Sequence, residues 1–177
     1  MIRGLLAAAV IWAAPVTAQE AWHAEVLALA ENLGHAFRAE AGIDWLMPRT
    51  HPAIRTLSAQ EFGLAPDDMD QRVRAGYALS ATMLDMLVHQ PVPDRVVFGS
   101  NAQGLRWGMV PFRVQAQRKG EAALPETCSL FLFFTAGDGW FVHGIGKLKT
   151  EASLAEALPD LAAALPTDRP DCANPTS

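Results

Sequence analysis

In the first half of the chain, large apolar residues recur at the spacing of helices. Residues 20–41 predict an amphipathic helix, with Gly42 ending it, because the apolar side chains share one face: Trp22, Val26, Leu29, Leu33 and Phe37. A shorter helix is predicted over residues 52–62. A third is predicted to begin at Pro66, which suits a first helical turn, and to run to about His89, before two prolines.

From residue 94 onwards the apolar pattern becomes that of strands. Four strands are predicted, over residues 95–98, 105–117, 128–135 and 140–148. The third contains five consecutive apolar residues, Leu130 to Phe134, which is typical of a central strand covered on both faces. The Asp138-Gly139 pair predicts a tight hairpin between this strand and the last one.

The strand over residues 105–117 contains a change of parity. Its apolar residues move from odd to even positions: Leu105, Trp107 and Met109, then Val110, Phe112 and Val114. A single buried face cannot include both sets, so we expect a bulge or sharp bend between Gly108 and Pro111. Such a bend would let the sheet curve around a pocket.

The end of the chain is predicted to be helical from Ser153, which forms a capping box with Glu156. Pro159 should break the segment into two short turns. Its apolar stripe consists of Leu154, Leu158, Leu161 and Leu165. Together the elements indicate one α+β domain over residues 19–165, with N-terminal helices packed on a curved antiparallel four-stranded sheet and a short C-terminal helical segment.

This order of elements resembles that of the nuclear transport factor two-like (ketosteroid-isomerase-like) proteins. The residues that carry the resemblance are the bent strand 105–117, the Phe-rich strand 128–135 and the hairpin 135–142. The resemblance implies a cone-shaped fold in which helices pack on a curved antiparallel sheet. It implies no single function, because that family contains both enzymes and binding modules.

The first eighteen residues have the pattern of a cleaved secretory signal. Arg3 precedes an apolar run over residues 4–14, and the small residues Val16-Thr17-Ala18 follow Pro15. The alternative, a membrane anchor, is disfavoured because a spanning helix needs about 20 apolar residues. We therefore expect cleavage after Ala18 and a protein that is periplasmic or secreted, with no transmembrane segment after cleavage.

Two cysteines, Cys128 and Cys172, lie in the part expected to be exported. In an oxidising compartment such a pair favours a disulfide, while reduced thiols or a metal pair are the alternatives. The bridge would tie down the Pro-rich tail, residues 166–177.

Charge and motifs exclude several classes of function. The formal net charge is −5, which argues against nucleic-acid binding. The segment 144–147 lacks the residues of a phosphate loop, and the acidic residues 67–70 lack the glycine and terminal glutamate of a calcium loop. No zinc or nucleophile motif is present, so we expect neither metal nor cofactor.

His143 is the one candidate for acid or base chemistry. It lies between Phe141 and Ile145 on one face of its predicted strand. The alternative is a half-buried histidine hydrogen-bonded within the sheet. Residues that could line a ligand pocket with it are Trp107, Phe112, Phe141, Tyr77 and Met83.

These features favour an exported, non-catalytic module that binds an apolar small molecule or a partner protein. A second hypothesis is a cofactor-independent pocket enzyme, a hydrolase or isomerase, that uses His143 with a carboxylate such as Asp44 or Asp85. A third is an envelope assembly subunit, which a large exposed apolar patch would mark.

Overall fold

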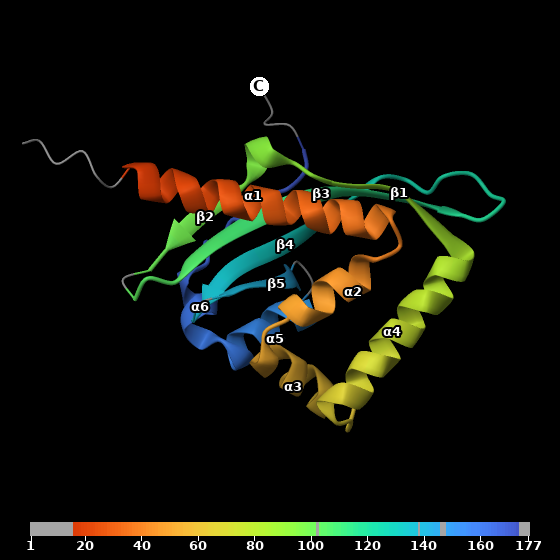
Figure 1. Ribbon diagram of the computed structural model, residues 1–177, viewed down its shortest axis with the longest axis horizontal. Coiled ribbons are helices and arrows are strands. Elements are labelled where there is room, and N and C mark those ends of the chain that lie inside the picture. The colour runs from red at the N-terminus through yellow and green to blue at the C-terminus, as the bar shows by residue number, and fades with distance from the viewer. Residues whose placement is uncertain (1–15, 102, 138, 146–147, 174–177) are drawn as a thin grey trace, which may run out of the picture.

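The computed structural model describes residues 16–101, 103–137, 139–145 and 148–173. These residues form an antiparallel sheet with helices on both of its faces (Figure 1). The α+β class is therefore confirmed. In chain order the elements are α1 (Val16–Arg38), α2 (Gly42–Leu46), η1 (Met47–Arg49), α3 (Pro52–Glu61), α4 (Pro66–Met83), β1 (Leu84–Pro91), η2 (Pro93–Arg95), β2 (Val97–Ser100), β3 (Arg106–Arg118), β4 (Thr127–Ala136), β5 (Gly139–Ile145), α5 (Leu148–Ala157) and α6 (Pro159–Ala164). The predicted leader, residues 1–18, lies outside the described residues except for 16–18, which begin α1.

The sheet has five strands, all antiparallel, in the order β1-β3-β4-β5. The short strand β2 pairs with β3 beyond the end of β1. As predicted, β4 is an inner strand, and Ala136 pairs with Gly139 across the hairpin to β5. Gly137 in that turn has φ of 60°, a conformation that glycine adopts without a steric cost.

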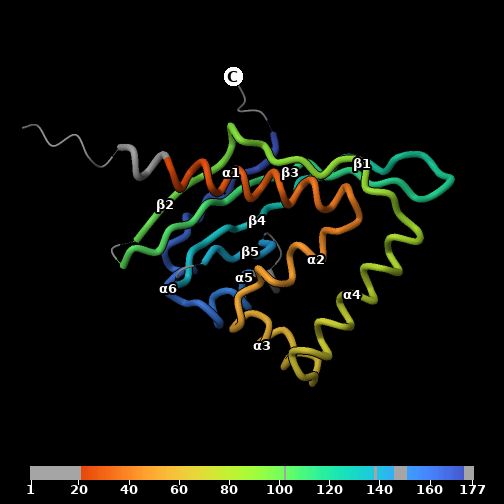
Figure 2. Tube along the Cα trace, in the orientation of Figure 1, coloured from red at the N-terminus to blue at the C-terminus, as the bar shows by residue number. Residues whose placement is uncertain are grey.

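Each face of the sheet has its own apolar core. Figure 2 traces the backbone of the elements that contribute to them. On one face, α1 contributes Trp22, Val26, Ala30 and Leu33, which pack with Val110, Phe112, Phe133 and Val142. On the other face, residues of α3, α5 and α6 pack with alternate residues of β3, β4 and β5: Ile54, Leu154, Leu161, Trp107, Met109, Leu130, Leu132, Phe134 and Ile145. We call these the α1 core and the α6 core.

These two cores explain the parity change along β3, and the predicted bulge there is wrong. The register between β3 and β4 is unbroken from Trp107 to Val114. Trp107 and Met109 enter the α6 core, while Val110 and Phe112 enter the α1 core. Both faces of β3 are covered, so apolar residues at odd and even positions are compatible with a regular strand.

The third helix is shorter than predicted, because residues 84–91 form β1. The strand pairs with β3 from Leu84 to Pro91, with one irregularity between Met86 and Val88. Met83, Met86 and Leu87 fit helical spacing, but pairing with β3 outweighs this local preference. The sheet therefore has one strand more than the sequence pattern predicts.

Two further boundaries differ from the prediction. The helix α1 ends at Arg38, and Glu40, with φ of 59°, takes the left-handed position predicted for Gly42. Gly42 instead begins α2, where a Cβ would lie 2.4 Å from the ring of Phe37. At the other end of the chain β5 ends at Ile145, and α5 begins at Leu148, before the predicted capping box. The predicted break at Pro159 is confirmed, because α6 starts there.

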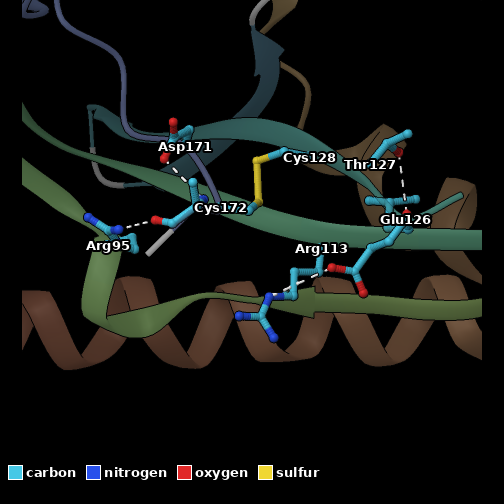
Figure 3. Close-up of a disulfide and its surroundings, with 9 residues drawn as sticks. Arg95, Arg113, Glu126, Thr127, Cys128, Asp171 and Cys172 are labelled. Atoms are coloured by element: carbon cyan, nitrogen blue, oxygen red, sulfur yellow. Dashed lines mark hydrogen bonds and ion pairs between the residues drawn. A yellow bond between two sulfur atoms is a disulfide. The ribbon is translucent and has the colours of Figure 1, made fainter. Parts of the chain in front are cut away.

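The disulfide between Cys128 and Cys172 is present, as predicted (Figure 3). It joins β4 to the C-terminal tail, with the two Cα atoms 5.7 Å apart. On the other side of the tail, Arg95 donates a hydrogen bond to the backbone oxygen of Ala173. A disulfide of this kind is consistent with folding in an oxidising compartment.

Candidate functional site

An apolar pocket of about 200 Å³ lies where α5 meets α6, at one end of β3 and β4. Seven of its nine lining residues are apolar, and the other two are Thr135 and Asp160. The apolar residues are Leu105, Phe134, Ala136, Ala157, Leu158, Pro159 and Leu161. We call this hollow the α6 pocket.

The break between α5 and α6 produces the pocket. Leu154 in α5 and Leu161 in α6 are 2% and 1% exposed, so both helices are fixed on the sheet through the α6 core. Between them the chain leaves the helical conformation at Leu158, where φ is −143° and ψ is 67°. Proline at position 159 has no N–H to continue α5, so the helix breaks there, and the pocket lies at this break.

The lining of the α6 pocket contains few polar groups. The Thr135 hydroxyl oxygen accepts a hydrogen bond from the backbone N–H of Arg106, at 3.0 Å, so it is already engaged in the sheet. Asp160 is exposed and is the only charged residue among the described residues of the lining. A cavity of about 150 Å³ lined by apolar groups accommodates benzene. The pocket therefore has room for a single ring or a short acyl chain.

The structure brings only some of the predicted pocket residues together. Trp107 and Phe141 lie in or against the α6 core, as does most of the lining of the α6 pocket. Phe112 lies in the α1 core, on the opposite face of the sheet. Tyr77 is half-buried on α4, where its ring makes an edge contact with Phe37 at 6.0 Å, and Met83 is exposed at the end of α4. Burial raises the pKa of Tyr77 above its ordinary value.

His143 is half-buried on β5, opposite Leu132 of β4. Asp85 is on β1, and β1 and β5 are opposite edges of the sheet. Three strand spacings separate them, about 14 Å, which is far beyond hydrogen-bond distance. Asp44, the other predicted carboxylate partner, forms an ion pair with Arg74 that joins α2 to α4. The catalytic pairing with Asp85 is therefore absent from this fold.

His89 is a buried titratable residue that the sequence pattern placed at the end of a helix. On β1 its side chain is 4% exposed and lies among the rings of Phe37, Phe112 and Phe131. Burial, with the charge of Arg38 as the smaller cause, lowers the pKa of His89 to about 4. The imidazole is therefore neutral near pH 7, and it is enclosed by apolar groups.

His51 begins α3 as its N-terminal cap. Its Nδ1 accepts a hydrogen bond from the backbone N–H of Ala53, at 3.2 Å. The ring also contacts Phe141 on β5, with centroids 4.8 Å apart. Burial lowers the pKa of His51, which favours the neutral form that can accept this hydrogen bond. Its position is explained by helix capping.

Two other hollows have a more polar lining than the α6 pocket. One, of about 430 Å³, lies between the C-terminal tail and residues 94–97, and it contains charged groups of both signs. The other, of about 600 Å³, lies between the end of α4 and the turn over residues 118–121. Within the described ranges, no three His, Cys, Asp or Glu residues are grouped as metal ligands. The helices in those ranges include none with the length and hydropathy of a membrane span.

Comparison with known proteins gives no match to a family model, to a curated protein or to a solved structure. The resemblance to the nuclear transport factor two-like proteins gains no support from these comparisons. A function for this chain is therefore argued from its own geometry.

Proposed function

We propose that this protein is an exported, non-catalytic module that binds a small apolar molecule in the α6 pocket. The observation that carries the proposal is the pocket's composition, because seven apolar side chains surround a volume of about 200 Å³. Small-molecule sites are concave and mostly apolar, with few polar groups that fix orientation. The pocket is smaller than a drug-sized site, so the ligand is a single ring or a short acyl chain.

The lining of the α6 pocket is held in place by the sheet. Phe134 is fully buried and pairs with Trp107 on one side and with Phe141 on the other. The walls come from α5 and α6, which are anchored by Leu154 and Leu161. Little reorganisation is needed before a ligand enters, and a preformed site reduces the entropic cost of binding.

Binding of toluene and indole to the mature protein tests this function. Ala157 lines the pocket, so Ala157→Phe fills it, whereas exposed Ala155 on the same helix does not line it and provides the matched control Ala155→Phe. We expect NMR shifts at the methyl groups of Leu105 and Leu161 in the wild type and in Ala155→Phe, and none in Ala157→Phe. Absence of shifts in the wild type, or shifts that persist in Ala157→Phe, would contradict the proposal.

Export to the periplasm or the medium is the second part of the proposal. It is supported by the leader pattern of residues 1–18 and by the disulfide between Cys128 and Cys172. We expect the protein recovered from its own cells to begin at Gln19 and to have no free thiol. Mass spectrometry of fractionated cells measures both. Full-length protein with reduced cysteines in the cytoplasmic fraction would contradict export.

A further inference from the structure

The helix α4 makes unusually little contact with the rest of the protein. None of its 18 residues is buried, and none belongs to the α1 core or the α6 core. Figure 1 shows α4 at the outside of the molecule, joining α3 to β1. A surface helix normally buries an apolar stripe against the body of its domain. Here Met69, Val73 and Tyr77 are half-buried, while Leu79 and Met83 are 62% and 53% exposed.

Two more exposed apolar side chains lie on segments close to the end of α4. Leu87 on β1 and Leu124 in the β3–β4 connection are also exposed. Backbone hydrogen bonds join these segments. The N–H of Lys119 donates to the carbonyl oxygen of Met83 at 3.0 Å, and the N–H of Leu124 donates to the carbonyl oxygen of Ala116 at 2.8 Å. We define the α4 patch as Leu79, Met83, Leu87 and Leu124. Among the described residues, these are four of the five large apolar side chains that are exposed.

A hollow lies beside the α4 patch. It measures about 600 Å³ and lies between the last turn of α4 and the turn over residues 118–121. It is lined by Thr82 and Met83 of α4, by Leu84 at the start of β1, and by Arg118, Lys119 and Glu121. Leu79 projects from the same stripe of α4 as Met83, one helical turn earlier. The surface therefore presents a protruding apolar side chain next to a partly apolar hollow.

The charges around the α4 patch are balanced. Lys119 lies 3.7 Å from Asp85, and Arg118 lies 3.8 Å from Glu121, so two cations accompany two anions. The whole chain has a formal net charge of −5, and most approaches of one copy to another are therefore repulsive. At the patch the local charges add no repulsion of their own, and each cation can meet an anion of a second copy. Balanced charge fits a second copy better than it fits a strongly acidic or basic partner.

We propose that the α4 patch is the interface of a symmetric homodimer, in which Leu79 of each copy enters the hollow of the other. A two-fold contact uses the same surface on both copies, so a protrusion beside a hollow is self-complementary. Because α4 is about 27 Å long and 10–12 Å across, it offers roughly 300 Å² of projected area. A standard interface covers roughly 800 Å² per copy, so the proposed dimer also uses β1 and residues 118–124.

Sedimentation of the mature protein from micromolar to submillimolar concentration tests this proposal. We expect a dimer for the wild type and a monomer for Leu79→Glu. The matched control is Phe62→Glu, since Phe62 is also large, apolar and exposed but lies before α4 and outside the patch. A wild type that stays monomeric, or a Leu79→Glu variant that stays dimeric, overturns the proposal.

A second variant keeps the test decisive if Leu79→Glu fails to fold. Lys119 is half-exposed and its ion pair with Asp85 is at the surface, so Lys119→Glu should leave the fold intact. The charges around the patch then become net negative. Repulsion between two such patches should weaken the dimer by at least about tenfold in Kd, and added salt should restore part of the affinity. An unchanged Kd for Lys119→Glu overturns the proposed interface.

Discussion

The imidazole of His89 stacks on the ring of Phe37, with centroids 4.4 Å apart and planes 24° apart. The contact joins β1 to α1, and Arg38 strengthens the join by donating a hydrogen bond to the His89 backbone oxygen at 2.5 Å. The side-chain Nδ1 of His89 is buried and has no hydrogen-bond partner among the described residues. A proton on this ring would place a positive charge between aromatic side chains and near Arg38.

The stability of the protein should therefore fall in acid. The ordinary pKa of histidine is 6.5, and in the folded protein the pKa of His89 is about 4, so the unfolded chain binds the proton more readily. The contribution of neutral His89 to the free energy of unfolding is fully present above pH 6.5. It is lost as the pH falls towards 4, which lowers the free energy of unfolding by up to about 3 kcal/mol. Urea denaturation at a series of pH values measures this loss. In His89→Phe the slope should be smaller, while His35→Phe, at an exposed position of α1, should keep it.

Glycine 34 allows the same helix to approach β1 closely. A Cβ at this position would lie 2.5 Å from the backbone oxygen of His89, which cannot move without disturbing the strand. Gly34→Ala should therefore destabilise the protein by about 1–3 kcal/mol. Gly76 is the matched control, because a Cβ there meets nothing within 4 Å. In the interior of α4, Gly76→Ala should stabilise by about 0.5–1 kcal/mol. Denaturation midpoints that move in the same direction would contradict this contrast.

The cap formed by His51 gives a third prediction. His51→Ala removes the acceptor for the Ala53 N–H and should cost about 1 kcal/mol of unfolding free energy. His51→Asn keeps an acceptor at the cap and should recover most of that loss, because asparagine is among the best N-cap residues. Chemical denaturation of both variants at neutral pH provides the measurement. Equal losses in the two variants would show that contact with Phe141, not capping, is the role of His51.

The features that were predictable from sequence depend on local chemistry. Leu130 to Phe134 could only suit a strand covered on both faces, and β4 is such a strand. Pro159 has no N–H and had to interrupt the last helical segment. With only two cysteines, a single pairing was available once oxidation was assumed.

The features that were missed depend on contacts between distant segments. Residues 84–91 fit a helix locally, and they form β1 because the long strand β3 provides a partner along their whole length. Leu158 and Leu161 of the α6 pocket were visible as part of a stripe, but the pocket exists only because Leu105 and residues of β4 lie close to them. His89 became a buried residue for the same reason, since its neighbours come from α1, β3 and β4.

The disulfide should contribute strongly to stability, mainly through the C-terminal tail. Cys128 and Cys172 are 44 positions apart, and closing such a loop is worth about 4 kcal/mol in the chain-entropy estimate. Replacing both cysteines by serine should lower Tm by roughly 8–16 °C in a domain of this size. In this variant the backbone amides of Thr167 to Arg169 should exchange their hydrogens faster than in the wild type. Exchange in α6 should change little, because Leu161 remains buried. A Tm within about 2 °C of the wild type would mean that Arg95 and the other tail contacts suffice without the bridge.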